Sequence, residues 1–301
     1  KIKSFMWLFN SSVGRKAVMS ITGIFLILFI TFHVLMNAVA ILWPAAYNSV
    51  CGFLGANWYA LVGTLVLAGG FVLHIVYAFI LTVQNKRARG NNAYEVTSRP
   101  KSVEWASQNM LVLGLIVIAF TCVHLYQFWA KMMLAELAGT ETTLPCGMVV
   151  EPSNGAAFLM LTFKEWWVLV VYLIGFAALW FHMTHGFWSA FQSLGANNTT
   201  WLPRIKNIAC AWATVCCLLF AVEAVTFSVK ANCEDCAKAY ILAPTAHKAP
   251  CPEMKCDKGG CPEMKCDKPC DKKCDKPCDK KYDKPCDKKC EGNDSTAAPQ
   301  N

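Results

Sequence analysis

The sequence predicts an all-α membrane protein with five transmembrane helices, the first four forming a bundle, followed by a low-complexity C-terminal tail. Of its 301 residues, 55% are hydrophobic and only 16% are charged, which is too apolar a composition for an ordinary soluble domain. The charges are also unevenly placed. No Asp or Glu occurs between Lys16 and Tyr94, whereas residues 251–290 are rich in Lys, Asp and Cys. The chain therefore joins a part suited to lipid to a part suited to water.

Five apolar stretches are long enough to cross a bilayer, which takes about 20 residues of helix. They lie at residues 17–43, 58–84, 106–135, 164–194 and 207–230. The first follows a basic segment, as in a secretory signal, but it is too long and lacks a small-residue cleavage site, so we expect a retained membrane helix. Residues 1–230 are thus predicted to form a transmembrane domain, and residues 231–301 a disordered external tail.

Lys and Arg predict how the helices are oriented. They gather at the N-terminus and near residues 86–104 and 195–206, whereas the two loops on the opposite side have only Lys131 and Lys164 as basic residues. By the positive-inside rule, the N-terminus lies in the cytoplasm and the C-terminal tail outside. The formal net charge of +8 does not indicate a nucleic-acid partner, because no basic stripe is interleaved with aromatic residues.

Each of the first four predicted spans contains a histidine in its apolar sequence. These residues are His33, His74, His124 and His182. A histidine in hydrocarbon is costly and is by default a functional residue. A hydrogen bond between helices would explain a single one equally well, but four in consecutive helices favour the binding of a cofactor.

Haem b is held by an imidazole on each side, which requires two histidines at matching depth on facing helices. At 1.5 Å per residue, His33 and His124 lie about 25 and 30 Å from the cytoplasmic edge, and His74 and His182 about 18 and 20 Å. The four residues therefore form two pairs, expected to hold two b haems. Covalent c-type haem is not indicated, because no C-x-x-C-H motif occurs.

His185 follows His182 by one helical turn, and only one of the two is expected to bind iron. Three residues on a helix turn by about 300°, so the two side chains point about 60° apart. The depth of His182 is closer to that of His74, which favours His182 as the ligand. We expect His185 to donate a hydrogen bond to a haem propionate or a main-chain carbonyl, or to lie at a subunit interface.

Two segments resemble a known family. SSVGRKAVMSITGIFLILFITFHVLMN, at residues 11–37, and FHMTHGFWSAFQSLG, at residues 181–195, are similar to the single-polypeptide dihaem cytochrome b subunit of succinate dehydrogenases and fumarate reductases, especially the Bacteroides-like type. The resemblance covers roughly residues 5–230. It implies a four-helix core with two b haems and a fifth peripheral helix. As axial ligands it implies His74 with His182 for the proximal haem and His33 with His124 for the distal one.

The resemblance also implies partners. An FAD-containing flavoprotein subunit, which binds the dicarboxylate, and an iron-sulfur subunit would dock on the cytoplasmic side of a bacterial inner membrane. The chain would pass electrons between the iron-sulfur clusters and a quinone, with menaquinone the usual substrate, near the distal haem. Some members have a proton-transferring glutamate two residues before the fourth ligand, where this chain has Trp180. Glu223 lies within the fifth span, where proton exchange with quinone and a neutral, hydrogen-bonded packing role both remain open.

Two other functions fit parts of the sequence. A b-type subunit of another respiratory enzyme, such as a hydrogenase or formate dehydrogenase, would share the membrane histidines but lack the two matched segments. A non-redox metal-binding protein would use the helices only to anchor the tail, in which CPEMKCDK occurs twice and most of the 17 cysteines lie. Disulfides, soft-metal binding and the absence of any defined site are all compatible with those cysteines.

Overall fold

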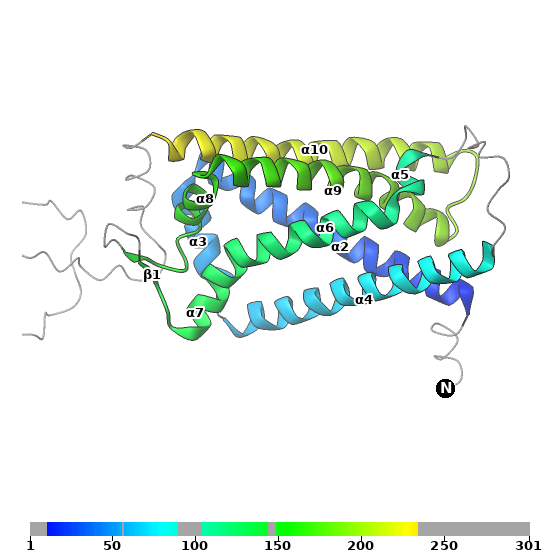
Figure 1. Ribbon diagram of the computed structural model, residues 1–301, viewed down its shortest axis with the longest axis horizontal. Coiled ribbons are helices and arrows are strands. Elements are labelled where there is room, and N and C mark those ends of the chain that lie inside the picture. The colour runs from blue at the N-terminus through cyan, green and yellow to red at the C-terminus, as the bar shows by residue number, and fades with distance from the viewer. Residues whose placement is uncertain (1–10, 56, 90–103, 144–148, 234–301) are drawn as a thin grey trace, which may run out of the picture. The chain divides into compact units, whose positions relative to one another are not determined.

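The computed structural model describes residues 11–55, 57–89, 104–143 and 149–233 (Figure 1). Five of its helical segments are long and apolar enough to cross a membrane, which confirms the predicted fold class. Four of them are the uninterrupted helices α2 (Ser12–Leu42), α4 (Trp58–Arg89), α9 (Trp166–Ser193) and α10 (Trp201–Ala231), and the fifth runs over Met110–Ala138. Most of the predicted tail, residues 234–301, lies outside the described residues.

Two of these helices, α2 and α10, begin earlier than the apolar stretches predicted for them, and polar side chains accept hydrogen bonds from main-chain N–H groups at both starts. Ser11 caps α2, its hydroxyl accepting a 2.8 Å hydrogen bond from the main-chain N–H of Gly14. At the start of α10, the Asn198 side chain accepts from the N–H groups of Thr200 and Trp201 at 3.1 and 2.6 Å. Pro203 does not interrupt α10, because the first turn of a helix tolerates proline.

The third membrane segment changes its helical form along its length. It starts after the short helix α5 (Trp105–Gln108) and a break at Asn109, and continues as α6 (Met110–His124). A π-helix, η1 (Leu125–Leu134), then follows, and the segment ends in α7 (Ala135–Ala138). π-Helices are rare and frequently occur at functional sites. This one begins directly after His124, one of the predicted ligands.

Short elements cover the end of the bundle remote from α5. They are α3 (Pro44–Phe53), α8 (Gly155–Phe163) and an antiparallel pair of two-residue strands, β1 (Thr142–Thr143) and β2 (Val149–Val150) (Figure 1). The fully buried Asn48 side chain joins α3 to α8, since it donates to the Asn154 side chain at 3.0 Å and accepts from the N–H of Ala156 at 2.9 Å. These short elements lie in the two loops that were predicted from the sequence to be on the side opposite the N-terminus.

The largest cluster of buried residues is formed mainly by α2, α8, α9 and α10. α9 and α10 pack along their length, and α2 lies against α4, α9 and α10. Glycines allow two close approaches: a Cβ on Gly70 of α4 would lie 2.7 Å from the Phe25 ring of α2, and a Cβ on Gly175 of α9 would overlap the Phe120 ring of α6. The expected fifth peripheral helix, α10, in fact makes extensive contacts with α9 and α2.

Candidate functional site

The four membrane histidines lie in two pairs inside the bundle. The ring centroids of His33 on α2 and His124 on α6 are 5.8 Å apart, with an interplanar angle of 85°. Those of His74 on α4 and His182 on α9 are 6.3 Å apart, with an angle of 68°. The rings that lie together are thus the ones matched by depth in the sequence. That they bind iron stays a prediction.

The two pairs occupy different levels along the helices. His74 contacts Thr22 of α2 at 3.2 Å, and His33 lies three turns further along the same helix, about 16 Å at 1.5 Å per residue. The His33/His124 pair, here called the outer pair, lies toward the end that α3 and α8 cover. The His74/His182 pair, the inner pair, lies toward α5. Together they extend over much of a hydrocarbon core about 30 Å thick.

The inner pair sits between small residues and one hydroxyl. Glycines flank both rings: a Cβ on Gly23 would lie 3.4 Å from the His74 ring, and a Cβ on Gly114 would lie 3.7 Å from the His182 ring. The side chain of Thr22 contacts Nδ1 of His74 at 3.2 Å. Nδ1 of His182 is buried, and none of the described residues is hydrogen-bonded to it. The ring of His182 therefore lacks the polar support that His74 receives.

Aromatic side chains surround the outer pair. The Phe29 ring stacks on His33 with centroids 5.3 Å apart and an interplanar angle of 17°. Phe128 of η1 lies 5.2 Å from His124, and Tyr172 of α9 lies 6.2 Å from it. An apolar, aromatic surrounding of this kind excludes water and favours a flat hydrophobic ligand.

Asn37 is the polar neighbour of the outer pair. Its side-chain NH₂ group donates to the main-chain oxygen of His33 at 2.8 Å and lies 3.3 Å from Nδ1 of the same ring. The hydroxyl of Tyr47, on α3, donates to the Asn37 carbonyl oxygen at 2.9 Å and so fixes the amide. Burial, followed by the neighbouring Cys51 and Glu223, raises the pKa of Tyr47 well above its ordinary value. Tyr47 is therefore a neutral donor, which connects the covering helix α3 to His33.

The spacing of each pair fits one metal ion between the two rings. A metal–imidazole bond is about 2 Å long and a ring nitrogen lies about 1 Å from the ring centre, so two imidazoles on opposite sides of one metal have centroids about 6 Å apart. The observed 5.8 and 6.3 Å match this value. Within the described residues, no group of three or more His, Cys, Asp or Glu could hold a metal. Two-histidine donor sets suit haem iron better than zinc, which takes three or four protein ligands.

His185 faces a different group of residues from His182. Its Nδ1 lies 3.6 Å from a carboxylate oxygen of Glu104, which is too long for a hydrogen bond but close enough for electrostatic attraction. Lys206 of α10 donates to the other Glu104 oxygen at 2.8 Å, and its ammonium lies 4.1 Å from the centre of the Trp188 ring. Burial opposes ionisation of Glu104, but Lys206 and His185 outweigh it and lower the pKa of that carboxyl. This contact joins three segments that are distant in the sequence, and sequence analysis did not predict it.

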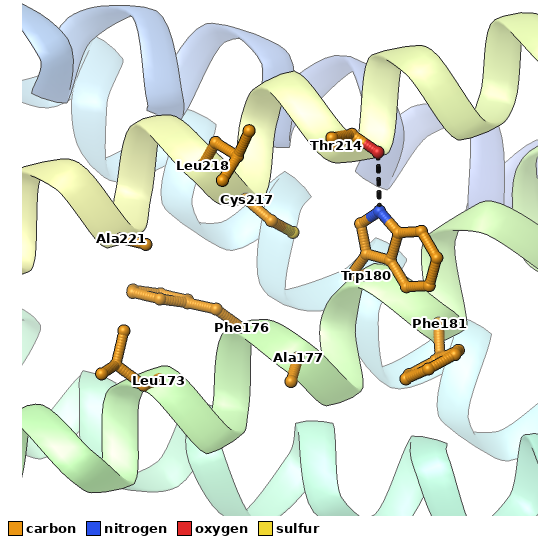
Figure 2. Close-up of a pocket in the computed structure, with 9 residues that line it drawn as sticks. All are labelled: Leu173, Phe176, Ala177, Trp180, Phe181, Thr214, Cys217, Leu218 and Ala221. Carbon is orange, nitrogen blue, oxygen red and sulfur yellow. Dashed lines mark hydrogen bonds between the residues drawn. The ribbon is translucent and has the colours of Figure 1, made fainter.

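Trp180 connects α9 to α10. It stands at the position where some members of the family that the sequence resembles have a glutamate. Its indole N–H donates to the Thr214 hydroxyl of α10 at 2.9 Å (Figure 2). The two residues border a groove of about 300 Å³ between α9 and α10, whose other lining residues are apolar or Cys217. None of the described residues that line this groove is a carboxylate, and Trp180 contributes to the packing of α9 against α10.

The fold and these contacts define a multi-pass membrane protein with two paired-histidine sites. Comparisons of the chain with protein-family models, with curated proteins and with solved structures gave no match. The function is therefore inferred from the residues and their geometry.

Glu223 is a buried acid near the outer end of α10. Its side chain is only 5% exposed, and none of the described residues is hydrogen-bonded to its Oε1 atom. The hydrogen-bonded packing role considered for it therefore has no visible partner. A buried polar group without a partner costs about 1–3 kcal/mol, and natural proteins retain such groups mainly where they serve a function.

Replacing Glu223 with leucine is expected to raise the free energy of unfolding by about 1–3 kcal/mol, because it removes the unpartnered carboxyl. Thermal unfolding of the purified protein in detergent would measure this, with Glu223→Gln, which keeps a polar group, as the matched control. If Glu223→Leu unfolds at a lower temperature than the wild type, the carboxyl has a stabilising partner and this account of it is wrong.

Proposed function

We propose that this chain is the membrane anchor and electron-transfer subunit of a succinate dehydrogenase or fumarate reductase. In this proposal it holds two b haems and passes electrons between a quinone, expected to be menaquinone, and an iron-sulfur subunit. A flavoprotein subunit bound to the iron-sulfur subunit carries the dicarboxylate chemistry. The single observation that supports it most strongly is the presence of two imidazole pairs at separate levels of one apolar bundle.

The histidines would act as axial ligands. His74 and His182 would hold the haem nearer the cytoplasm, and His33 and His124 the outer one. When bound, the two haems carry one electron at a time across the membrane. The rings of Phe29, Phe128 and Tyr172, together with the surrounding helices, exclude water from the outer pair. In such a site the imidazole is neutral, which is the form that binds iron.

The ends of the bundle would serve different partners. At the α5 end, charged side chains of Glu104 and Lys206 are partly exposed, with 40% and 38% of their surface accessible, and they suit a soluble protein partner. At the other end, α3 and α8 form a cover next to the outer pair. A quinone reaching the outer haem would pass near this cover. The orientation proposed from the basic residues, with the N-terminus in the cytoplasm, places the α5 end on the cytoplasmic side.

Purification of the chain from its native membrane in mild detergent tests the proposal. Co-purification of an FAD-containing subunit and an iron-sulfur subunit, with succinate-dependent quinone reduction or quinol-dependent fumarate reduction, is the expected result. Other dehydrogenase or hydrogenase subunits would instead favour a different b-type respiratory enzyme. A haem-free chain with metal on its cysteine-rich tail would favour the membrane-anchored metal-binding protein.

Truncation after residue 245 is expected to leave both haems and quinone activity intact, because the paired histidines all precede it. The measurement is the haem-to-protein ratio and the turnover of the truncated, membrane-inserted protein, compared with the full chain. Loss of either haem from a truncated protein that still inserts would show that the tail contributes to the site.

A further inference from the structure

The two histidines of the inner pair differ in their hydrogen bonding. Nδ1 of His74 has a polar partner in the Thr22 hydroxyl, 3.2 Å away, whereas none of the described residues bonds Nδ1 of His182. Thr22 is itself buried, with 8% of its surface exposed, and belongs to a different helix from His74. The contact therefore joins α2 to the His74 ring of α4 in the buried interior of the bundle.

The Thr22 hydroxyl has acceptors on its own helix. Its oxygen lies 2.9 and 3.0 Å from the main-chain oxygens of Val18 and Met19. A hydroxyl has one proton and two lone pairs, so when that proton is donated to one of these carbonyls, the Thr22 oxygen accepts from the His74 ring. In this arrangement the proton of the Thr22–His74 hydrogen bond is on Nδ1 of His74.

Gly23, next to Thr22 on α2, lies against the His74 ring, since a Cβ there would be 3.4 Å from Cε1 of the ring. Glycine at this position therefore leaves room for the ring beside the Thr22 hydroxyl.

We propose that Thr22 is a positioning residue that holds the proton of His74 on Nδ1, and so leaves Nε2 as the unprotonated nitrogen that is available to the inner site. Metal-binding histidines characteristically donate their other ring N–H to such an acceptor, which fixes the tautomer and ring orientation and makes the metal-binding nitrogen more basic. The assignment of the tautomer rests on the contacts alone, whereas its use in binding haem iron rests on the proposed function.

The first test measures the tautomer in the full-length, haem-free protein in detergent, by ¹⁵N NMR of labelled histidine. The His74 signal is identified by its loss in His74→Gln. We expect it to show protonation on Nδ1 in the wild type and a mixture of tautomers in Thr22→Val. Protonation of wild-type His74 on Nε2 would overturn the proposal.

The second test measures haem binding in the haem-loaded protein. Loss of the acceptor to which a metal-binding histidine donates costs about 10- to 100-fold in metal affinity, and because a neutral hydroxyl is a weaker acceptor than a carboxylate we expect about the lower value. In Thr22→Val, the inner haem should transfer to excess apomyoglobin about tenfold faster than in the wild type, while the outer haem serves as an internal reference. Thr22→Ser, which keeps the hydroxyl, should restore the wild-type rate.

Thr121→Val is the matched control. Thr121 makes the same type of bond to its own helix, to the Val117 oxygen at 2.8 Å, but no described histidine contacts its hydroxyl. Equal rates of inner-haem loss in the wild type and Thr22→Val would refute the positioning role. A wild-type chain that binds no haem but has His74 protonated on Nδ1 would support the tautomer assignment while refuting the proposed function, so the two failures are distinguishable.

Discussion

His182→Ala is expected to leave one haem per chain, with the inner site empty and succinate no longer able to reduce the outer haem. His185→Ala is expected to keep both haems, with at most a shift in the potential of the inner one. His182 lies 6.3 Å from its partner His74, whereas His185 is directed toward Glu104 at 3.6 Å and its ring lies 4.8 Å from that of Trp188. The two substitutions therefore remove chemically identical side chains, one turn apart, from different surroundings.

Pyridine haemochrome assays and redox-difference spectra of the two variants measure the outcome. If His182→Ala retains both haems and His185→Ala retains only one, then His185 and not His182 is the ligand of the inner haem. Addition of free imidazole to His182→Ala is a further check, because an imidazole that fits the vacated space should restore the spectrum of the inner haem. His185→Gln would separate the loss of the Glu104 contact from the loss of side-chain volume.

His124→Ala is expected to remove the outer haem and reduce quinone turnover to background, while succinate still reduces the inner haem. His124 lies 5.8 Å from His33 and about three helical turns from the level of His74, so the inner pair does not depend on it directly. Spectra taken after addition of succinate, together with quinone-reduction rates, test this. His247→Ala, in a region outside the described residues, is the matched control and should behave as the wild type.

The same variant distinguishes a loss of cofactor from a loss of fold. His124 lies among Phe120, Phe128 and Tyr172, so its replacement by alanine leaves a gap in an aromatic cluster. His124→Phe fills that space without a ligand and should also lose the outer haem. If His124→Phe retains two haems with bis-histidine spectra, another residue supplies the ligand and the outer pair is wrongly assigned.

The membrane spans and the histidine pairs could be predicted from the sequence for simple physical reasons. A helix rises 1.5 Å per residue and must keep about 20 apolar residues in hydrocarbon, so both the length of each stretch and the depth of a residue such as His33 or His124 follow from counting. Depth alone then matches His33 with His124 and His74 with His182, and the same rings lie together in the structure.

Other features depend on contacts between distant segments, which counting along one helix does not show. Thr22 meets His74, and Lys206 meets Glu104, across 52 and 102 positions of the chain. The helix α3 is too short to be found by a rule for membrane spans, and the buried Asn48 that fixes it to α8 looks like an ordinary loop residue. The π-helix after His124 differs from an α-helix in its main-chain hydrogen bonds. The pattern of apolar residues does not distinguish the two forms.

The haem content of the purified chain tests the central claim most directly. Quantitative haemochrome analysis, combined with low-temperature EPR of the oxidised protein, counts the b haems per polypeptide and reports their axial ligands. Two haems per chain, both low-spin with two histidine ligands, are predicted from the two imidazole pairs. A folded, membrane-inserted chain that contains no haem would contradict the two-haem claim. A chain with a single haem that persists after substitution of either inner histidine would contradict it as well.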